Sequence, residues 1–495
     1  MYQFINDYPR DKENHFSEEI QGVCHDDKYW FFTQDGSIWK IPVGQDLNQD
    51  FKSKSDKSKE VIKVTPGGHL GDMDYYENYL FIADHVAEDD TYISVYRAGD
   101  LSYVNRQAMR YYRGKRGANF HSIGWCAINK GFLYTSESQV GIHCDPIYIY
   151  KIDLNALEAG KDFLVFWSEI HLYDETGHRI ELKDMQGGCF DDQDRLHIAN
   201  GFYKNSGRSE QGITVVPVPA TPYKGGNYLV KRIAKSQQHG GFQYEFDSYG
   251  EEPEGLTWWD LDGDTKAPGF EGKLHVILLN NDIGSKDNFW FKHYSLNKGY
   301  EFGASISGEV SGPPNGVNVQ ISLYESGNSK PVDDYTLIGE KTYCFGVTKP
   351  GNYTLEAKAD GYETKRMELN VNESVTKDIS LSKKIPAFTT PPKGGKVPRS
   401  ALLKVSWKLN FDPVKQVILQ YGASGSIEQS KALAPDAEAT LLSASANEYC
   451  IRAYYSNTGY IESERFTVKN SRPRPLHPGA ALRPITKIDP DQKGE

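Results

Sequence analysis

A degenerate repeat in the first 300 residues constrains the fold of this chain more than any other feature. Each copy has a glycine in a short apolar strand, then a turn with acidic residues or Asn, then an aromatic-rich strand. The anchoring glycines, spaced 49, 53, 63 and 68 residues apart, are Gly22, Gly71, Gly124, Gly187 and Gly255. Such strands and turns are typical of antiparallel hairpins, and small sheets repeated radially form a propeller. We therefore predict a β-propeller over residues 1–300, with five blades, or six if residues 53–66 or 220–248 contain another.

Three cysteines support this alignment of the copies. Cys24, Cys126 and Cys189 each follow an anchoring glycine by two residues. Since side chains alternate along a strand, the three thiols are expected on the same side of the innermost strand in three blades, as small buried groups. The chain has six cysteines and no C-x-x-C pair, which argues against a zinc ribbon or a thioredoxin-like site.

The aromatic second strands, such as YLFIAD after Gly71 and FLYTSES after Gly124, resemble those of NHL, gluconolactonase-like and phytase-like propellers. This resemblance covers residues 15–297 and implies the propeller fold. This chain does not contain the catalytic motif of any of these families, so the resemblance implies no catalytic residue. The 40–45-residue period of WD repeats is also absent.

Residues 301–384 form a second predicted module. The segments ISGEV at 306–310, YCF at 343–345 and PGNYTLEA at 350–357 resemble the carboxypeptidase regulatory-like domain. That resemblance implies a transthyretin-like β-sandwich that acts as a spacer or adhesive module and has no catalytic residues of its own.

The rest of the chain contains a linker, a third module and a tail. Residues 385–399 are rich in Pro and Gly and are predicted to be a linker. Residues 400–470 resemble a fibronectin type III or immunoglobulin-like sandwich, with Trp407 as the core tryptophan and Tyr449-Cys450 in the later strand. The charged, Pro-rich residues 471–495 are expected to be disordered. The predicted fold class is all-β: a propeller followed by two small β-sandwich domains.

Charge and hydropathy exclude some partners. The formal net charge is −11, which disfavours nucleic acid, and no apolar run approaches the length needed to span a bilayer. The modular architecture is typical of extracellular or cell-surface proteins. The start of the sequence is polar and has no signal-peptide pattern in this numbering, so a cytoplasmic location stays open.

Polar residues beside the anchoring glycines are the candidate ligand-binding residues. Equivalent residues of successive blades face one another around the propeller axis, so these side chains are expected to gather at one rim of the channel. The alternative is that they only bind buried backbone groups and water. The candidates are Gln21, His69, Asp72, His121, Trp125, Gln186 and Glu254.

One acidic loop is a candidate calcium site. Asp260, Asp262, Asp264 and Glu271 imitate the spacing of an EF-hand loop. However, Thr265 replaces the usual glycine, and the flanking segments are predicted strands rather than helices. The alternative is a solvated acidic hairpin. Calcium is the only cofactor that the sequence suggests.

Three functions remain open from the sequence. The first is a binding protein whose propeller face holds a glycan, a peptide or a protein, since Tyr and Trp are abundant and suit such contacts. The second is a metal-dependent hydrolase or lyase at the propeller centre, with Glu254, Asp72 and His121 as its acids and base. The third is an intracellular scaffold. Whether the chain is an enzyme is undecided, and binding is preferred.

Overall fold

The computed structural model describes residues 2–10, 15–17, 19–48, 60–63, 68–111, 118–138, 146–180, 182, 184–201, 212–236, 250–264, 266–267, 269–281, 288–297 and 302–384, followed by short strands between residues 388 and 471. Nearly all regular structure in these ranges is β-strand, as predicted. The described exceptions are helix α1 (Leu154–Glu158) and the 3-10 turn η1 (His15–Ser17). None of the described helices is long and apolar enough to cross a membrane.

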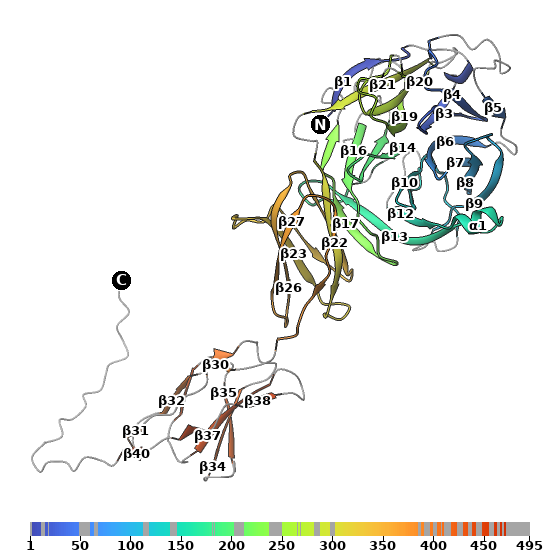
Figure 1. The fold of residues 1–495 in the computed structure, drawn as a ribbon. Coiled ribbons are helices and arrows are strands. Elements are labelled where there is room, and N and C mark those ends of the chain that lie inside the picture. The colour runs from blue at the N-terminus through green and yellow to red at the C-terminus, as the bar shows by residue number, and fades with distance from the viewer. Residues whose placement is uncertain are drawn as a thin grey trace, which may run out of the picture. The chain divides into compact units, whose positions relative to one another are not determined.

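The first 300 residues form a propeller of five sheets around a common axis (Figure 1). Blade 1 contains β2 (Ile20–His25), β3 (Tyr29–Gln34), β4 (Ser37–Pro42) and β5 (Glu60–Lys63), and blade 2 contains β6 (His69–Tyr76), β7 (Tyr79–Ala87), β8 (Asp90–Arg97) and β9 (Tyr103–Ala108). Blade 3 contains β10 (Ala127–Asn129), β11 (Phe132–Thr135), β12 (Ile147–Ile152), β13 (Leu164–Tyr173) and β17 (Asn227–Lys231). Blade 4 contains β14 (Met185–Phe190), β15 (Arg195–Asn200), β16 (Gly212–Pro217) and β18 (Ala234–Ser236), and blade 5 contains β19 (Gly250–Trp258), β20 (Leu274–Asn281), β21 (Asn288–Leu296) and β1 (Tyr2–Asp7).

The two segments suggested as a sixth blade belong to existing sheets. Strand β5, within residues 53–66, is the outer strand of blade 1. Strand β17 crosses to blade 3 and pairs there in parallel with β13, whereas β18 completes blade 4. The described residues therefore form five blades.

The anchoring glycines bring the five innermost strands into backbone contact at the axis. A Cβ atom added to Gly71 would lie 2.2 Å from the Gly124 carbonyl oxygen, and one on Gly255 would lie 2.6 Å from Gly22 Cα. The other three glycines likewise meet backbone of the next blade within 2.7 Å. In β2, β6, β14 and β19 the pairing register shifts at or beside the glycine, and such bulges bend a strand locally. Glycine recurs because only a residue without a side chain permits this approach.

The three repeat cysteines occupy the expected positions. Cys24 lies in β2, Cys189 in β14, and Cys126 directly precedes β10; all three are buried free thiols. Burial raises the pKa of each thiol well above its usual value. Their part is therefore packing rather than chemistry.

Strand β1 closes the ring by pairing antiparallel with β21 of blade 5. Tyr2 of this strand is hydrogen-bonded to the Nδ1 atom of His197 in blade 4, and His197 Nε2 lies 3.0 Å from an Asp191 carboxylate oxygen. Asp191 also accepts a hydrogen bond from the Arg195 guanidinium. This buried chain of polar groups fastens the first strand of the protein to blade 4.

The next described residues, 302–384, form a β-sandwich. One sheet contains β22 (Ala304–Ser311), β25 (Thr342–Val347), β28 (Val375–Thr376) and β29 (Ile379–Ser380). The other contains β23 (Val319–Glu325), β24 (Asp333–Leu337), β26 (Gly351–Ala359) and β27 (Lys365–Val371). Inward residues of both sheets, such as Ile306, Phe345 and Leu355, form one apolar core, as expected for two sheets that pack face to face.

This sandwich packs against the propeller, and the two belong to one compact unit, Met1–Ser382. The backbone N–H of Asn227 in β17 donates to Thr342 Oγ1 at 3.0 Å, and that hydroxyl donates back to the Asn227 carbonyl at 2.9 Å. Lys231 forms an ion pair with Asp333. Cys344 of β25 is part of the apolar core of blades 3 and 4. The extra strand β17 thus supplies the contact surface for the sandwich.

The second unit, Lys383–Glu495, is described only by its strands. They are β30 (Phe388–Thr390), β31 (Val397–Pro398), β32 (Leu403–Ser406), β33 (Lys408–Leu409), β34 (Val417–Gly422), β35 (Gln429–Leu433), β36 (Glu438–Leu441), β37 (Glu448–Tyr454), β38 (Tyr460–Glu462), β39 (Phe466–Thr467) and β40 (Asn470–Ser471). Strands β30 and β31 of the predicted linker pair with β33 and β40. Trp407 and residues 472–495 lie outside the described residues.

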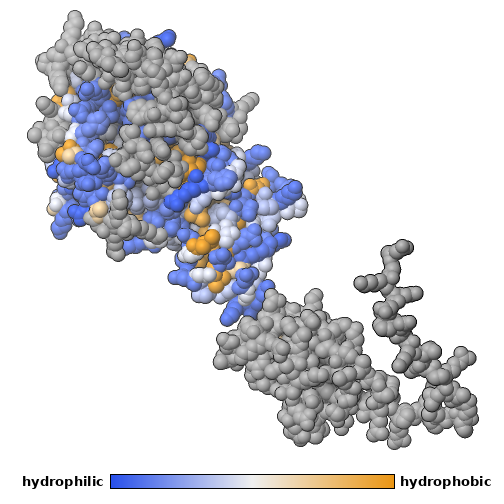
Figure 2. All heavy atoms as spheres, turned by 180° about the vertical axis from the view of Figure 1, so that it is seen from behind, coloured by the Kyte–Doolittle hydropathy of each residue, from blue (hydrophilic) through white to orange (hydrophobic). Residues whose placement is uncertain are grey.

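The surface of the described residues is mainly hydrophilic in the view of Figure 2, where apolar patches are small and separate. Large hydrophobic side chains that are strongly exposed include Tyr103, Val165, Val332 and Ile338.

Candidate functional site

A cavity of about 360 Å³, lined mainly by residues with polar side chains, lies beside the axis of the propeller, where blades 1 to 4 meet. Four of the seven predicted ligand-binding residues line it: Gln21, His69, His121 and Gln186. The other lining residues are Gly71, His85, Ser122, Ile123, Gly124, Ser138 and Asp184. We call this space the rim cavity.

His69 is held in place at the start of β6. Its Nδ1 atom lies 2.9 Å from Asp35 Oδ1, and its Nε2 atom lies 3.0 Å from Gln21 Oε1. Both partners come from blade 1, so this histidine joins the first two blades at the rim. About half of its side chain remains exposed, so it is accessible from solvent.

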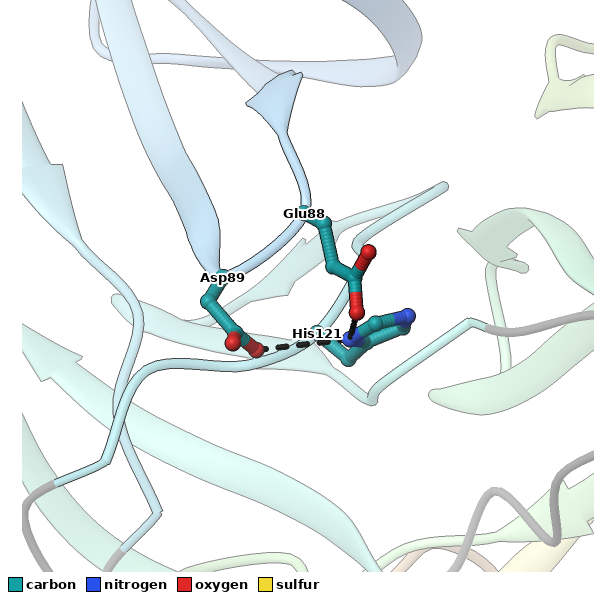
Figure 3. A group of neighbouring side chains, drawn as sticks. All are labelled: Glu88, Asp89 and His121. Carbon is teal, nitrogen blue, oxygen red and sulfur yellow. Dashed lines mark hydrogen bonds and ion pairs between the residues drawn. The ribbon is translucent and has the colours of Figure 1, made fainter.

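His121 is oriented by two carboxylates (Figure 3). Its Nδ1 atom lies 3.3 Å from Glu88 Oε1 and 3.3 Å from Asp89 Oδ1, both in the turn between β7 and β8. Its backbone N–H donates to Glu137 Oε1 at 3.0 Å. A carboxylate on one ring nitrogen fixes the orientation of the ring and leaves Nε2 for another partner.

His85 lies directly opposite His69 in the β6–β7 hairpin. Burial, and then the nearby His69 and His121 rings, lower the pKa of His85 below its usual value. Its Nε2 atom is buried and has no hydrogen-bond partner among the described residues. The rim cavity therefore brings together three imidazoles from blades 2 and 3, and His85 among them has a buried nitrogen without a partner in the described residues.

Asp72 does not line the rim cavity. It is fully buried at the axis, where its two carboxylate oxygens accept hydrogen bonds from Val23 N at 3.1 Å and Gly188 N at 3.0 Å. Burial raises the pKa of Asp72 well above its usual value. These bonds join β6 to β2 and β14. Asp72, next to Gly71, therefore helps to hold the blades of the propeller together.

Trp125 is also part of the core rather than of the rim. Its side chain is fully buried, and its indole nitrogen donates to Ser136 Oγ at 2.9 Å. The ring packs on Gly188, where an added Cβ would come within 2.2 Å of it. A ligand in the rim cavity has no direct access to this indole.

Glu254 lies beneath the cavity in a buried acidic group. The Gln186 side-chain amide donates to Glu252 Oε2 at 3.0 Å and makes a longer contact of 3.4 Å with Glu254 Oε1. Burial, reinforced by the charge of Glu252, raises the pKa of Glu254 well above its usual value. Gln186 therefore connects the rim cavity to a carboxyl pair that favours holding a proton.

The acidic loop after β19 uses its carboxylates for its own turns. Asp262 accepts a hydrogen bond from Gly272 N at 2.8 Å, Asp264 accepts one from Lys266 N at 2.8 Å, and Asp260 lies 2.8 Å from Lys273 Nζ. Among the described residues, the group with three ligand atoms within 4.8 Å of one another is Glu88, Asp89 and His121 rather than this loop with Glu271. Calcium binding by the loop stays an untested prediction, and this arrangement gives it no support.

His85 was not among the ligand-binding residues predicted from the sequence, although it lines the rim cavity. The usable signal was the Glu77-Asn78 turn of the β6–β7 hairpin, because a hairpin turn sets which residues face each other. Counting outward from that turn places residue 69 opposite residue 86, next to His85, and the register shift between Leu70 and Met73 then makes His85 the partner of His69.

No protein-family model and no curated protein matches this chain. Among solved structures, it is similar to the extracellular domain of the putative hybrid two-component system BT3049 from B. thetaiotaomicron, with 10% identity over 92% of this chain and 56% of that chain and a TM-score of 0.28. PorZ, a surface component of the type-IX secretion system of Porphyromonas gingivalis, aligns with 10% identity over 72% of this chain and 52% of its own, with a TM-score of 0.27. The Trypanosoma rangeli sialidase aligns with 8% identity over 72% of this chain and 76% of its own, with a TM-score of 0.29. This chain spans about half the length of the first two.

Proposed function

We propose that this chain is a binding protein and that the rim cavity takes a small polar ligand through hydrogen bonds to His85 and His121, beside His69. The observation that carries the proposal is the buried Nε2 atom of His85, which lacks a partner among the described residues. A buried polar atom without a partner costs about 1–3 kcal/mol. A ligand that donates or accepts a hydrogen bond there offsets this cost.

The chemistry of the lining favours hydroxyl and amide groups. Imidazoles, amides, serine hydroxyls and Asp184 surround the cavity, and this set offers both donors and acceptors. Aromatic stacking, which the abundance of Tyr and Trp had suggested, has no support at this cavity, since its described lining contains no Tyr, Trp or Phe. The ligand class we favour is a sugar unit of a glycan, with an extended peptide as the alternative.

A catalytic role at the axis has less support. Asp72, one of the acids suggested for a metal-dependent hydrolase, is occupied by two backbone N–H groups, and Glu254 lies beneath the cavity within a carboxyl pair. Binding requires only the hydrogen-bonding groups that reach the rim cavity.

The test is binding of the full chain to immobilised neutral glycans and to a random peptide array. We expect glycan binding that weakens at least tenfold in His85→Ala and in the double variant His69→Gln/His121→Gln. His178→Gln is the matched control, because His178 is exposed elsewhere in blade 3. Binding that is equal in the parent and in both rim variants, or absent from both arrays, would overturn the proposal. Binding to peptides alone would indicate that the ligand is an extended peptide rather than a sugar.

A further inference from the structure

The rim cavity offers mainly hydrogen-bond acceptors, and His85 provides the first of them. Its Nε2 atom is buried without a partner among the described residues. Burial and the nearby His69 lower the pKa of this ring, whereas a hydrogen bond with the Ala87 backbone raises it. A bond that favours the protonated ring is one that the ring donates to a carbonyl, so the ring proton lies on Nδ1. In the neutral imidazole, Nε2 therefore presents a lone pair.

His121 provides a second acceptor. Its Nδ1 atom faces the carboxylates of Glu88 and Asp89, at 3.3 Å each, and its other nitrogen lies on the opposite side of the ring (Figure 3). The carboxylates hold the ring proton on Nδ1, so the neutral ring presents a lone pair at Nε2. A carboxylate behind an imidazole also makes the free nitrogen more basic, which strengthens Nε2 as an acceptor.

Gln186 provides a third acceptor, an amide oxygen. Its side-chain N–H donates to Glu252 Oε2 at 3.0 Å, in the acidic group beneath the cavity. The Oε1 atom lies beside Gly124, because a Cβ added to this glycine would be 3.1 Å from Gln186 Oε1 and 3.1 Å from Ser138 Oγ. Since Gly124 and Ser138 both line the cavity, the amide oxygen faces the space as an acceptor.

Donors are few among the described residues that line the cavity. Ser122 and Ser138 contribute hydroxyl groups, and Ser122 Oγ is buried without a partner in the described part of the chain. The amide of Gln21 is in contact with His69. The described lining contains no Lys or Arg, whereas Asp184 adds a carboxylate. The cavity is therefore rich in acceptors and has no fixed positive charge.

We propose, on the basis of the function proposed for the rim cavity, that this cavity selects a sugar with a free, protonated amino group. An ammonium group has three N–H donors and no acceptor, which suits the two imidazole lone pairs and the amide oxygen. Hydrogen bonds from a charged donor are also stronger than those from a neutral one. The hydroxyl groups of the same sugar can donate to and accept from Ser122 and Ser138.

Other sugars match this lining less well. A sugar hydroxyl donates one hydrogen bond without a charge, and an N-acetyl group donates one and adds a carbonyl acceptor that meets few donors. An acidic sugar is repelled by Asp184 in the lining and by Glu88 and Asp89 behind His121. The acceptors of the cavity therefore favour the amine over the hydroxyl, the acetamide and the carboxylate.

The experiment is calorimetric titration of the full chain, at neutral pH, with the β-1,4-linked disaccharides of glucosamine, N-acetylglucosamine and glucose. These compounds share one ring skeleton and differ in the group at carbon 2, which is an amine, an acetamide or a hydroxyl. We expect the glucosamine disaccharide to bind at least tenfold more tightly than the other two. Its affinity should fall as salt is raised, because the attraction depends on charge.

The two carboxylates behind His121 provide the variant. Glu88→Gln/Asp89→Asn removes two charges from exposed side chains, so the blade still folds. It should weaken the binding of the glucosamine disaccharide about tenfold and change that of the glucose disaccharide by less than about twofold. The matched control is Glu158→Gln/Asp162→Asn, which removes two exposed carboxylates that do not line the cavity.

The outcomes separate this ligand class from the function proposed for the cavity. If the glucose or N-acetylglucosamine disaccharide binds as tightly as the glucosamine one, the preference for an amine is wrong, and loss of that binding in His85→Ala would still support the proposed function. A preference for glucosamine that Glu88→Gln/Asp89→Asn leaves unchanged would also overturn the inference, because the amine would then bind elsewhere. Absence of measurable binding of all three compounds would overturn it too, and the glycan and peptide arrays would then decide the proposed function.

Discussion

The Nδ1 atoms of His275 and His293 lie 2.7 Å apart inside blade 5. The Nε2 atom of each ring faces a backbone carbonyl, Trp259 O at 2.8 Å and Tyr8 O at 2.9 Å. Both rings are buried among aromatic side chains, including Phe270 and Phe291. Burial, and then the proximity of His293, lower the pKa of His275 well below its usual value; burial lowers that of His293 to about 4.

This pair predicts a loss of stability in mild acid. In the unfolded chain both histidines take up a proton near pH 6.5. In the folded chain both Nε2 atoms donate to carbonyls, so the pair has room for at most one added proton, between the two Nδ1 atoms. The fold is therefore favoured above pH 6.5 and loses up to about 1.4 kcal/mol per pH unit for each proton it cannot take up, as the pH falls from about 6.5 toward 4. The other groups near the pair are His25 and Lys292, which also disfavour protonation.

Urea unfolding midpoints at pH 7.5 and pH 5.0 measure this effect. The parent should unfold at a clearly lower urea concentration at pH 5.0, and His275→Asn should reduce the difference between the two midpoints whatever its own stability. His178→Gln, at an exposed position, should keep the parent difference. Equal midpoints of the parent at the two pH values would contradict the prediction.

Asp191 should contribute strongly to stability, although the sequence around it is typical of an ordinary turn. Burial alone would raise its pKa, but the hydrogen bond from His197 and the charge of Arg195 hold the pKa of this carboxyl below its usual value. Asp191→Ala leaves a buried guanidinium without its carboxylate, and breaking such a pair costs about 3–5 kcal/mol. We expect a fall of several degrees in the melting temperature, measured by calorimetry. The neighbouring Asp192→Ala, which removes an exposed carboxylate, should change it little; equal effects of both would contradict this.

The axis glycines should not tolerate a side chain. In Gly71→Ala the new Cβ would lie 2.2 Å from the Gly124 carbonyl oxygen, so blades 2 and 3 must separate. We expect this variant to be insoluble or to lose its cooperative melting transition. Gly99→Ala is the matched control, because no atom lies within 4 Å of the added Cβ there. A Gly71→Ala protein that melts like the parent would contradict backbone contact at the axis.

Asp72→Ala should destabilise the propeller, and Asp72→Asn should do so less. Removal of the carboxylate leaves the N–H groups of Val23 and Gly188 without their partner, at about 1–3 kcal/mol for each. The asparagine retains one oxygen as an acceptor. Chemical unfolding of the two variants measures the two losses, and an alanine variant as stable as the parent would contradict the prediction.

The sequence by itself determined the all-β class, the five innermost strands and the positions of the axis glycines. These features follow from local periodicity and from the repetition of one hairpin unit around the axis. Because the copies can be aligned, a strand or glycine that is clear in one copy locates its equivalent in the others. The positions of Cys24, Cys126 and Cys189 were predicted for the same reason.

Only the tertiary structure decided which polar residues beside the glycines reach a cavity. The bulges at the glycines change the direction of successive side chains, so His69 reaches the rim cavity while Asp72, three residues later, is buried among backbone N–H groups. The transfer of β17 from blade 4 to blade 3, the contact of Asp191 with His197, and the row that Tyr148, Glu169 and Asn227 form across β12, β13 and β17 depend on strands that are distant in sequence. A local sequence pattern does not specify which distant strand will pair with a given strand, because that pairing depends on the packing of the whole unit.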